Sequence, residues 1–267
     1  MMKPELLYYD LGPRVTAFST TRHGGYSQGV YGEMNINRYC GDDPGALGKN
    51  HQALAQELGL PYDHILLPHQ VHGNHCEVID DGFYVSPIEK SCRLLEGADG
   101  LVTDQKDVCI GVSTADCIPI LLYDLKNHIA AAVHAGWRGT VQRIVRQAIR
   151  TMSLYFRSLP ENLRAVIGPG ISLGNFEVGQ EVYDAFAAAK FNMDRIARQY
   201  PDREDPSRMK WHIDLPRCNA LQLRALGVPE KDIYLSDICT YDRVSDFFSA
   251  RRLGPQSGRI YTGIILH

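Results

Sequence analysis

Histidine and cysteine side chains recur in three short segments whose residue types suit one soft metal ion. The segments are His69-Gln70-Val71-His72-Gly73, Ala115-Asp116-Cys117 and His134-Ala135-Gly136-Trp137-Arg138-Gly139. Together they could offer two imidazoles and a thiolate. A closed structural zinc site takes four protein ligands, whereas three ligands leave a position for water or substrate. If the segments converge in the fold, the set predicts a catalytic metal site.

No local metal-binding motif brings these side chains together. The seven cysteines, at positions 40, 76, 92, 109, 117, 218 and 239, contain no C-x-x-C pair, and no H-E-x-x-H helix is present. If residues 69–72 are extended, His69 and His72 face opposite ways, so one strand would not present both to the same ion. His75 is a further candidate, with a surface position as its alternative. Convergence therefore depends on the fold.

Length, composition and charge indicate an ordinary soluble globular protein. The chain has 267 residues, 44% of them hydrophobic and 22% charged, and a chain of this length buries roughly 75% of its unfolded surface. A formal net charge of −3 gives no electrostatic footprint for nucleic acid or an anionic membrane, so a small-molecule partner is favoured. No membrane span or signal peptide is expected. The cysteines are odd in number and have no regular spacing, which argues against a disulfide scaffold and favours reduced thiols in the cytoplasm.

Short apolar runs and helical repeats outline the elements that must position the candidate ligands. Strands are expected over residues 108–112, 118–123, 129–133, 164–167 and 258–266, and helices over 44–59, 139–152, 181–190 and 214–226. The polar interval 199–210 is expected to be an exposed loop. No repeat or linker divides residues 1–267, which predicts one domain. Because strands and helices alternate without a regular βαβ rhythm, the predicted fold is a mixed-sheet α+β or α/β sandwich.

These elements place Cys117 and His134 at the ends of strands, next to a candidate anion site. Residues 134–139 are expected to form a strand-to-helix turn. This turn places Arg138 near a helix N-terminus, where backbone N–H groups and the helix dipole favour an anion. Arg138 is therefore interpreted as an anion clamp, with a solvated charge as the alternative.

Four further polar residues each have two interpretations. Asp116 could accept a hydrogen bond that orients an imidazole, or it could cap a turn. Arg22 could help to hold the same anion, although His23-Gly24-Gly25 is equally a tight turn without a ligand. Asn35 is a candidate for binding a substrate hydroxyl. Glu177 is either a substrate contact or a buried structural carboxylate.

The order of short motifs along the chain carries a resemblance to a known family. The motifs are Ser19-Thr20-Thr21-Arg22-His23-Gly24-Gly25, Gly41-Asp42-Asp43-Pro44, Gln70-Val71-His72-Gly73, Ala98-Asp99-Gly100, Thr114-Ala115-Asp116-Cys117, His134-Ala135-Gly136-Trp137-Arg138-Gly139, Ile167-Gly168-Pro169, Phe176-Glu177-Val178-Gly179, Cys239-Thr240 and Phe247-Phe248-Ser249-Ala250-Arg251-Arg252. In this order they resemble the YfiH family, also called the multicopper polyphenol oxidase, laccase-domain or peptidoglycan editing factor family. Two positions depart from it: His69 stands at a variable position, and Ala250 stands where an aromatic residue is usual.

The resemblance implies a fold, a metal site and an activity. It implies a single-domain mixed α/β sandwich, similar to the cytotoxic necrotizing factors, with a zinc ion held by His72, Cys117 and His134. It also implies phosphorolysis of adenosine, inosine and methylthioadenosine, and deamination of adenosine. The function we expect is therefore that of a cytoplasmic zinc enzyme acting on purine nucleosides, with inorganic phosphate as co-substrate held by Arg138. The oligomeric state is not indicated.

Three other functions fit part of the same residue set. Cys117 and His134 could be the nucleophile and base of a hydrolase that acts on amides or peptidoglycan precursors. Copper-dependent polyphenol oxidation is the second alternative, although a multicopper centre requires many more histidines than this trio, and the ten histidines of the chain are scattered. A non-catalytic binding role is the third.

Overall fold

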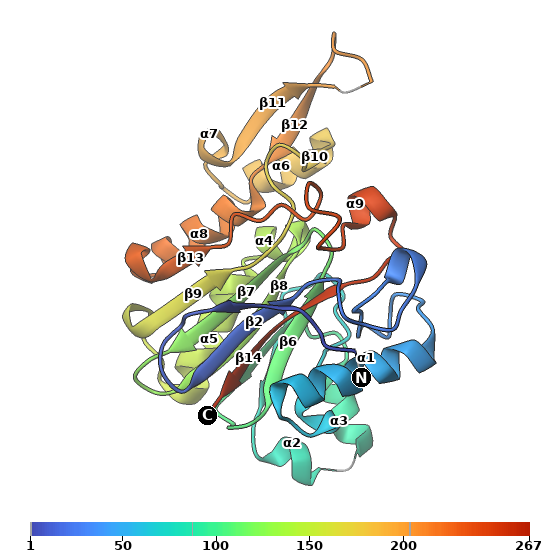
Figure 1. Ribbon diagram of the computed structural model, residues 1–267. Coiled ribbons are helices and arrows are strands. Elements are labelled where there is room, and N and C mark those ends of the chain that lie inside the picture. Colours follow the sequence, from blue (N-terminus) through green and yellow to red (C-terminus); the bar gives the residue numbers. More distant parts are fainter. Residues whose placement is uncertain (1, 87, 203) are drawn as a thin grey trace.

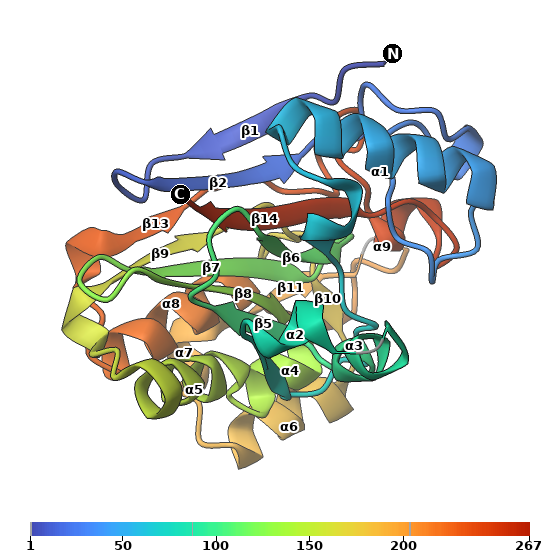
Figure 2. The same ribbon diagram turned by 90° about the horizontal axis from the view of Figure 1, so that it is seen from below.

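Two β-sheets packed face to face form the body of the protein, and helices cover both outer faces (Figure 1, Figure 2). The computed structural model describes residues 2–86, 88–202 and 204–267. One sheet has the order β1 (Leu6–Tyr9), β2 (Val15–Thr20), β14 (Ile260–Leu266), β6 (Cys109–Thr114) and β3 (Ile65–Leu66). The other has the order β13 (Ile233–Leu235), β9 (Leu163–Ile167), β7 (Ile118–Asp124), β8 (Ile129–Ala135), β5 (Gly100–Thr103) and β4 (Cys76–Ile79).

Both sheets contain parallel and antiparallel pairs. In the first, β6 pairs antiparallel with β14 and parallel with β3. In the second, β5 pairs parallel with β4 and antiparallel with β8. The predicted mixed-sheet sandwich is therefore confirmed, and each predicted strand is present with its ends shifted by no more than two residues.

Alternation of side chains along the strands produces three apolar layers. Leu121, Tyr123, Ala130 and Ala132 face Ile110, Val112 and Ile264 between the two sheets. The opposite side of β7 and β8 packs against helices α5 (Ile144–Phe156) and α8 (Leu215–Ala225). The outer side of the first sheet packs against α1 (Pro44–Leu58). Because successive strand residues point to opposite faces, one strand serves two layers.

Local capping explains where the longer helices begin and end. Asp43 accepts the backbone N–H of Ala46 and Pro44 occupies the first turn of α1, while Gly59 ends the helix in the left-handed conformation with φ 67°. Asp214 caps α8 in the same way. The remaining helices are α2 (Gly82–Val85), α3 (Ile88–Leu95), α4 (Trp137–Val141), α6 (Gln180–Ala188), α7 (Met193–Ile196) and α9 (Ala250–Leu253).

The predicted continuous helix after Gly139 is interrupted. Helix α4 ends at Val141 and α5 begins at Ile144, because Arg143 adopts the left-handed conformation with φ 64°. The Arg143 side chain is held outside the helix by its position over the Phe191 ring and a hydrogen bond to the Ala189 carbonyl. Helical spacing of apolar residues does not detect such a break, because the left-handed turn at Arg143 leaves that spacing in the sequence unchanged.

The polar interval 199–210 was expected to be a loop, and this expectation is wrong at both of its ends. Strands β11 (Ala197–Pro201) and β12 (Met209–Ile213) pair as a hairpin that projects from the body (Figure 1), and β10 (Glu177–Val178) pairs with β12. Lys210 forms ion pairs with Glu177 and Asp202 across this arm. Backbone pairing in the arm is compatible with exposed polar side chains, which is why composition indicated a loop.

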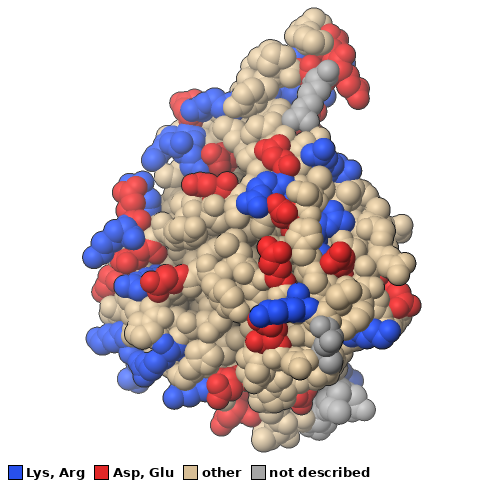
Figure 3. All heavy atoms as spheres, in the orientation of Figure 1, with Lys and Arg blue, Asp and Glu red and all other residues tan. Residues whose placement is uncertain are grey.

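On the face drawn in Figure 3, basic and acidic side chains are interspersed. In the part of the chain that the structure describes, no helix is both long enough and apolar enough to cross a bilayer.

Candidate metal centre

The fold brings His72, Cys117 and His134 together. One potential ligand atom from each side chain lies within 4.8 Å of the other two, and among the described residues no other group of three or more His, Cys, Asp or Glu side chains meets this condition. The two imidazole rings meet edge to face, with centroids 4.8 Å apart. Convergence of the three segments, on which the catalytic interpretation depended, is thus present in the structure.

Strand pairing places two of these side chains. His134 lies in β8 opposite Pro119 of the antiparallel strand β7, and Cys117 directly precedes β7. The backbone at Cys117 turns sharply because Asp116 adopts a positive φ of 81°. Asp116 is held there by two hydrogen bonds. Its carboxylate accepts them from the Thr240 hydroxyl and from the Arg251 backbone N–H, and each donor–acceptor distance is 2.7 Å.

His72 is presented by a loop between β3 and β4. Its φ of 61° is left-handed, so residues 69–72 do not form an extended segment. The Gln70 side chain anchors the loop by two hydrogen bonds to the backbone of Ser113 in β6. His69 points elsewhere: it stacks on Tyr39 and contacts Glu96, while His75 contacts Glu77. Of the three histidines between residues 69 and 75, His72 is therefore the one that joins the cluster.

Asp99 links the loop to the strand. Its carboxylate accepts a hydrogen bond from Nδ1 of His134 over 2.7 Å. It also accepts hydrogen bonds from the backbone N–H groups of residues 71, 72 and 73, with N···O distances of 3.2, 3.0 and 2.6 Å. Although burial opposes ionisation, these donors lower the pKa of Asp99. An ionised Asp99 accepts only, so Nδ1 of His134 carries the proton and Nε2 is the nitrogen available to a metal.

The structure thus assigns to Asp99 the contact that the sequence suggested for Asp116. Asp99 lies in the motif Ala98-Asp99-Gly100, where a carboxylate between small residues just before a buried strand was the available signal. Its role was missed because it stands far from every ligand in the sequence.

Gly136 closes the inner side of the cluster. A Cβ atom at this position would lie 3.1 Å from Sγ of Cys117, 3.2 Å from Cδ2 of His72 and 3.7 Å from Cε1 of His134. The first two distances are tighter than ordinary van der Waals contacts, so a methyl group here would push Cys117 and His72 away by a few tenths of an ångström. The burial is graded, since His72 is exposed, Cys117 is partly buried and His134 is buried. The cluster is closed on one side and open on the other, as a site with a free coordination position requires.

The Cys117 thiol and the His134 imidazole perturb each other strongly. Burial opposes ionisation of both groups, but the pKa of Cys117 is lowered by His134 and His72, and the pKa of His134 is raised by Cys117 and Asp99. The arrangement favours a thiolate, which is the form of cysteine that binds a metal or acts as a nucleophile. The same geometry is therefore compatible with either chemistry.

A cavity of about 750 Å³, hereafter the site cavity, opens over the cluster. His72, Cys117 and His134 line it together with the polar side chains Asn37, Gln70, Ser113, Asp116, Arg251 and Arg259. The volume is within the range typical of small-molecule sites. Arg251 and Arg259 belong to the family motifs Phe247–Arg252 and Gly258-Arg259, but the sequence assigned no role to either, because both reach the cavity only through the fold.

The remaining predicted site residues do not line the site cavity. Arg138 is exposed, with its guanidinium 4.3 Å from the ring centroid of Trp137. Arg22 donates to the carbonyls of Gly32 and Val244. Asn35 is fully buried, and its side chain contacts Asp42 and the backbone N–H groups of Asn37 and Arg259. Glu177 pairs with Lys210 on the arm. The contacts of Arg22, Asn35 and Glu177 hold parts of the protein together.

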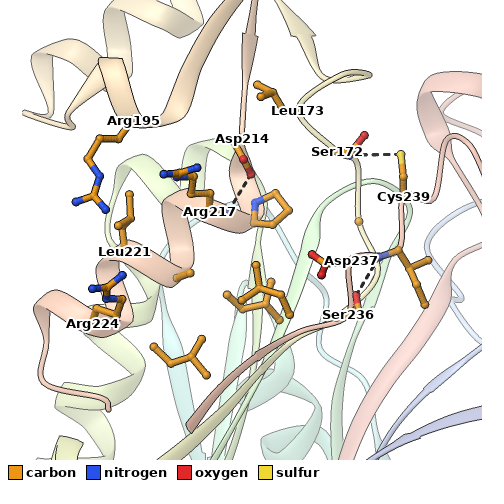
Figure 4. Close-up of a pocket in the computed structure, with 18 of the residues that line it drawn as sticks. Ser172, Leu173, Arg195, Asp214, Arg217, Leu221, Arg224, Ser236, Asp237 and Cys239 are labelled. Atoms are coloured by element: carbon orange, nitrogen blue, oxygen red, sulfur yellow. Dashed lines mark hydrogen bonds between the residues drawn. The ribbon is translucent and has the colours of Figure 1, made fainter. Parts of the chain in front are cut away.

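Figure 4 shows a second cavity, of about 610 Å³. Arg217, Leu221 and Arg224 of α8 line one wall, and Asp237 and Cys239 lie across from them. Gly170 lines this cavity and Ile171 lines the site cavity, so one short segment separates them. None of the three cluster residues reaches the second cavity. The site cavity is therefore the candidate active site.

Comparison with known proteins gives consistent matches over nearly the whole chain. A family model described as multi-copper polyphenol oxidoreductase laccase matches residues 16–267. A purine nucleoside phosphorylase from Bacteroides thetaiotaomicron is 41% identical over 253 residues, covering 95% of this chain and 92% of its own. Adenosine deaminase RL5, from an unknown prokaryotic organism, is 41% identical over 250 residues, covering 94% and 93%. The crystal structure of Bacillus licheniformis YfiH has a TM-score of 0.87 and 27% identity, covering 99% and 97%.

Proposed function

The chain belongs to the YfiH family, whose model is that of a multi-copper polyphenol oxidoreductase laccase, and from this premise we propose a zinc-dependent purine nucleoside enzyme. The observation that carries the proposal is the cluster of His72, Cys117 and His134, which opens into a cavity large enough for a nucleoside. The names of two relatives, each 41% identical, indicate the substrate class: one is a purine nucleoside phosphorylase and the other an adenosine deaminase.

The donor set fits a single zinc ion. His72, Cys117 and His134 would hold it, with Asp99 orienting His134 and Gly136 leaving room for the three side chains. Zinc supplies Lewis acidity, which brings the pKa of a water molecule towards neutrality and polarises substrate oxygens. A multicopper oxidase centre would need further clusters of imidazoles, and the described residues hold one group of this kind. Zinc is accordingly proposed in preference to copper.

Two reactions on one substrate class follow from the relatives. In phosphorolysis, a phosphate oxygen forms a bond to the anomeric carbon of the ribose while the bond to the purine nitrogen breaks, giving the free base and ribose 1-phosphate. In deamination, water replaces the amino group of adenosine and ammonia leaves. With Nε2 of His134 holding the metal, its Nδ1 would keep the proton that it donates to Asp99. Asp99 keeps the ring oriented in both reactions.

We propose further that residues 1–267 act as one catalytic domain in the cytoplasm, with purine nucleosides and phosphate as small-molecule partners. The family match extends over residues 16–267.

Product analysis tests the proposed function. Purified protein of known zinc content is incubated with adenosine, inosine and methylthioadenosine, each with and without inorganic phosphate. The expected products are free base and sugar 1-phosphate only when phosphate is present, and inosine from adenosine in either case. Free base without sugar phosphate would indicate hydrolysis. Absence of every product with fully metallated protein would contradict the proposal.

A cysteine hydrolase acting on amides or peptidoglycan precursors is the second candidate function. The Cys117 thiol lies between two imidazoles that lower its pKa despite its burial, which is the environment of a catalytic nucleophile as well as of a metal ligand. The two functions differ in their need for metal, so chelation and thiol labelling can distinguish them.

A further inference from the structure

We infer that Arg251 and Arg259 bind the phosphate co-substrate in the site cavity, an inference that rests on the proposed function. Both residues line the cavity that contains the cluster. Sequence reasoning assigned this role to Arg138, which is exposed and outside the cavity. The inference therefore moves the anion site from the turn after β8 to the C-terminal segment around α9.

The charges of the two guanidiniums are not neutralised by the protein. Both terminal nitrogens of Arg251 donate to the carbonyl of Glu177, and each N···O distance is 3.0 Å. The terminal nitrogens of Arg259 donate to the carbonyls of Pro255, Ser257 and Gly258, with N···O distances between 2.6 and 2.9 Å. In the part of the chain that the structure describes, no carboxylate lies in ion-pair range of either side chain. The carbonyl contacts orient the guanidiniums and leave their positive charges for a ligand.

The lining of the site cavity has an excess of positive charge. Asp116 is the carboxylate among the lining residues, and both of its oxygens already accept hydrogen bonds, from Thr240 and from the backbone of Arg251. Two arginines therefore face one occupied carboxylate. Such a cavity favours an anion, and two guanidiniums suit a tetrahedral oxyanion that carries two negative charges. Each guanidinium has five N–H donors, and the carbonyls occupy only part of them.

The backbone around both arginines is tied to the cluster and to the core. The Arg251 N–H contacts Asp116, which directly precedes Cys117. The Arg259 N–H contacts the buried Asn35. Because these links are short and partly buried, the two guanidiniums are held at the same cavity as the cluster before any ligand arrives. A phosphate bound by them would share the cavity with a nucleoside at the cluster.

Direct binding of inorganic phosphate tests the inference without requiring turnover. Isothermal titration of the zinc-loaded protein with phosphate, in chloride buffer without nucleoside, is compared for the wild type, Arg251→Gln, Arg259→Gln and Arg138→Gln. Arg252→Gln is the matched control, because Arg252 is the exposed neighbour of Arg251 and its guanidinium also donates to a carbonyl, that of Tyr241, but it does not line the cavity. Thermal unfolding checks that each variant is folded. Arg251→Lys and Arg259→Lys keep the charge and lose the fork.

We expect phosphate affinity to fall about tenfold or more in each glutamine variant at 251 and 259, with smaller losses in the lysine variants. The Arg252 variant should remain within about twofold of the wild type. If Arg138→Gln abolishes binding while the variants at 251 and 259 bind normally, the inference is overturned. It is also overturned if the wild type binds no phosphate, or if a nucleoside monophosphate binds at the arginines and phosphate does not. Phosphorolysis that persists unchanged in both variants would reject the inference and leave the proposed function standing.

Discussion

Nδ1 of His134 donates a hydrogen bond of 2.7 Å to the Asp99 carboxylate, and the backbone N–H of His72 donates one of 3.0 Å to the same carboxylate. One buried acid therefore sets the ring orientation of one candidate ligand and the backbone position of another. The connection joins a strand, β8, to a loop that lacks regular structure of its own. Together with the Gln70 side chain, which anchors the loop to Ser113, this contact holds His72 beside Cys117.

Replacing Asp99 by asparagine is expected to weaken zinc binding. The amide loses the negative charge that favours an imidazole proton on Nδ1, and it satisfies the N–H groups of the loop less well. Zinc affinity should fall roughly 10- to 100-fold, and the free energy of unfolding should fall by roughly 2–3 kcal/mol. A competition titration with a fluorescent chelator measures the first quantity and urea denaturation the second.

The control for this variant is Glu96→Gln. Glu96 forms an exposed contact with His69, outside the cluster, and its removal should change neither quantity appreciably. Wild-type zinc affinity in Asp99→Asn would show that the acid does not position the ligands.

Adding one methyl group at Gly136 is expected to disturb the cluster directly. The new Cβ would lie 3.1 Å from the Cys117 sulfur and 3.2 Å from the His72 ring, so Gly136→Ala should lose most of its bound zinc while remaining folded. Gly48→Ala is the matched control, since its Cβ in α1 meets nothing within 4 Å, and it should bind zinc normally with slightly higher stability. Full zinc occupancy in Gly136→Ala would contradict the tight packing of the cluster against this glycine.

Alkylation of Cys117 distinguishes a zinc enzyme from a cysteine hydrolase. If Cys117 binds zinc, the metal should protect it from iodoacetamide, and a chelator should expose it. In metal-free protein the lowered pKa of the thiol, which the two imidazoles produce against the effect of burial, should make labelling at pH 7 faster than that of an ordinary thiol. Peptide mass spectrometry measures the extent of labelling at each cysteine.

Two other cysteines serve as internal references in the same samples. Cys92 is exposed and should react with or without metal, whereas Cys109 is buried and should not react in folded protein. Rapid labelling of Cys117 in fully metallated, active protein, or full activity after zinc has been removed, would favour the hydrolase.

The types and order of the candidate ligands were predictable from the sequence, but their surroundings were not. Apolar runs predicted β7 and β8, and these strands place Cys117 and His134. Hydrophobic periodicity carries no information about Asp99, whose partners all lie more than 20 residues away in the chain. The left-handed backbone of His72 is likewise set by contacts with Asp99 and with the anchored Gln70 rather than by its own residue type.

The hairpin of β11 and β12 and the arginines of the cavity were missed for related reasons. Exposed polar strands have the composition of a loop, and only their register shows that they pair. Arg251 and Arg259 stand in a segment of the sequence that lies more than 100 residues beyond Cys117 and His134, and the C-terminal chain must return across the molecule to bring them near Asp116. The hairpin thus depends on a pairing that composition does not indicate, and the position of the arginines depends on contacts between distant parts of the chain.

Zinc stoichiometry, determined by elemental analysis of the purified protein and of single alanine variants, tests the central claim most directly. We expect one zinc per chain in the wild type, and loss of most of it in His72→Ala, Cys117→Ala and His134→Ala, while His69→Ala retains it. Retention of one zinc per chain in all three cluster variants would contradict the account.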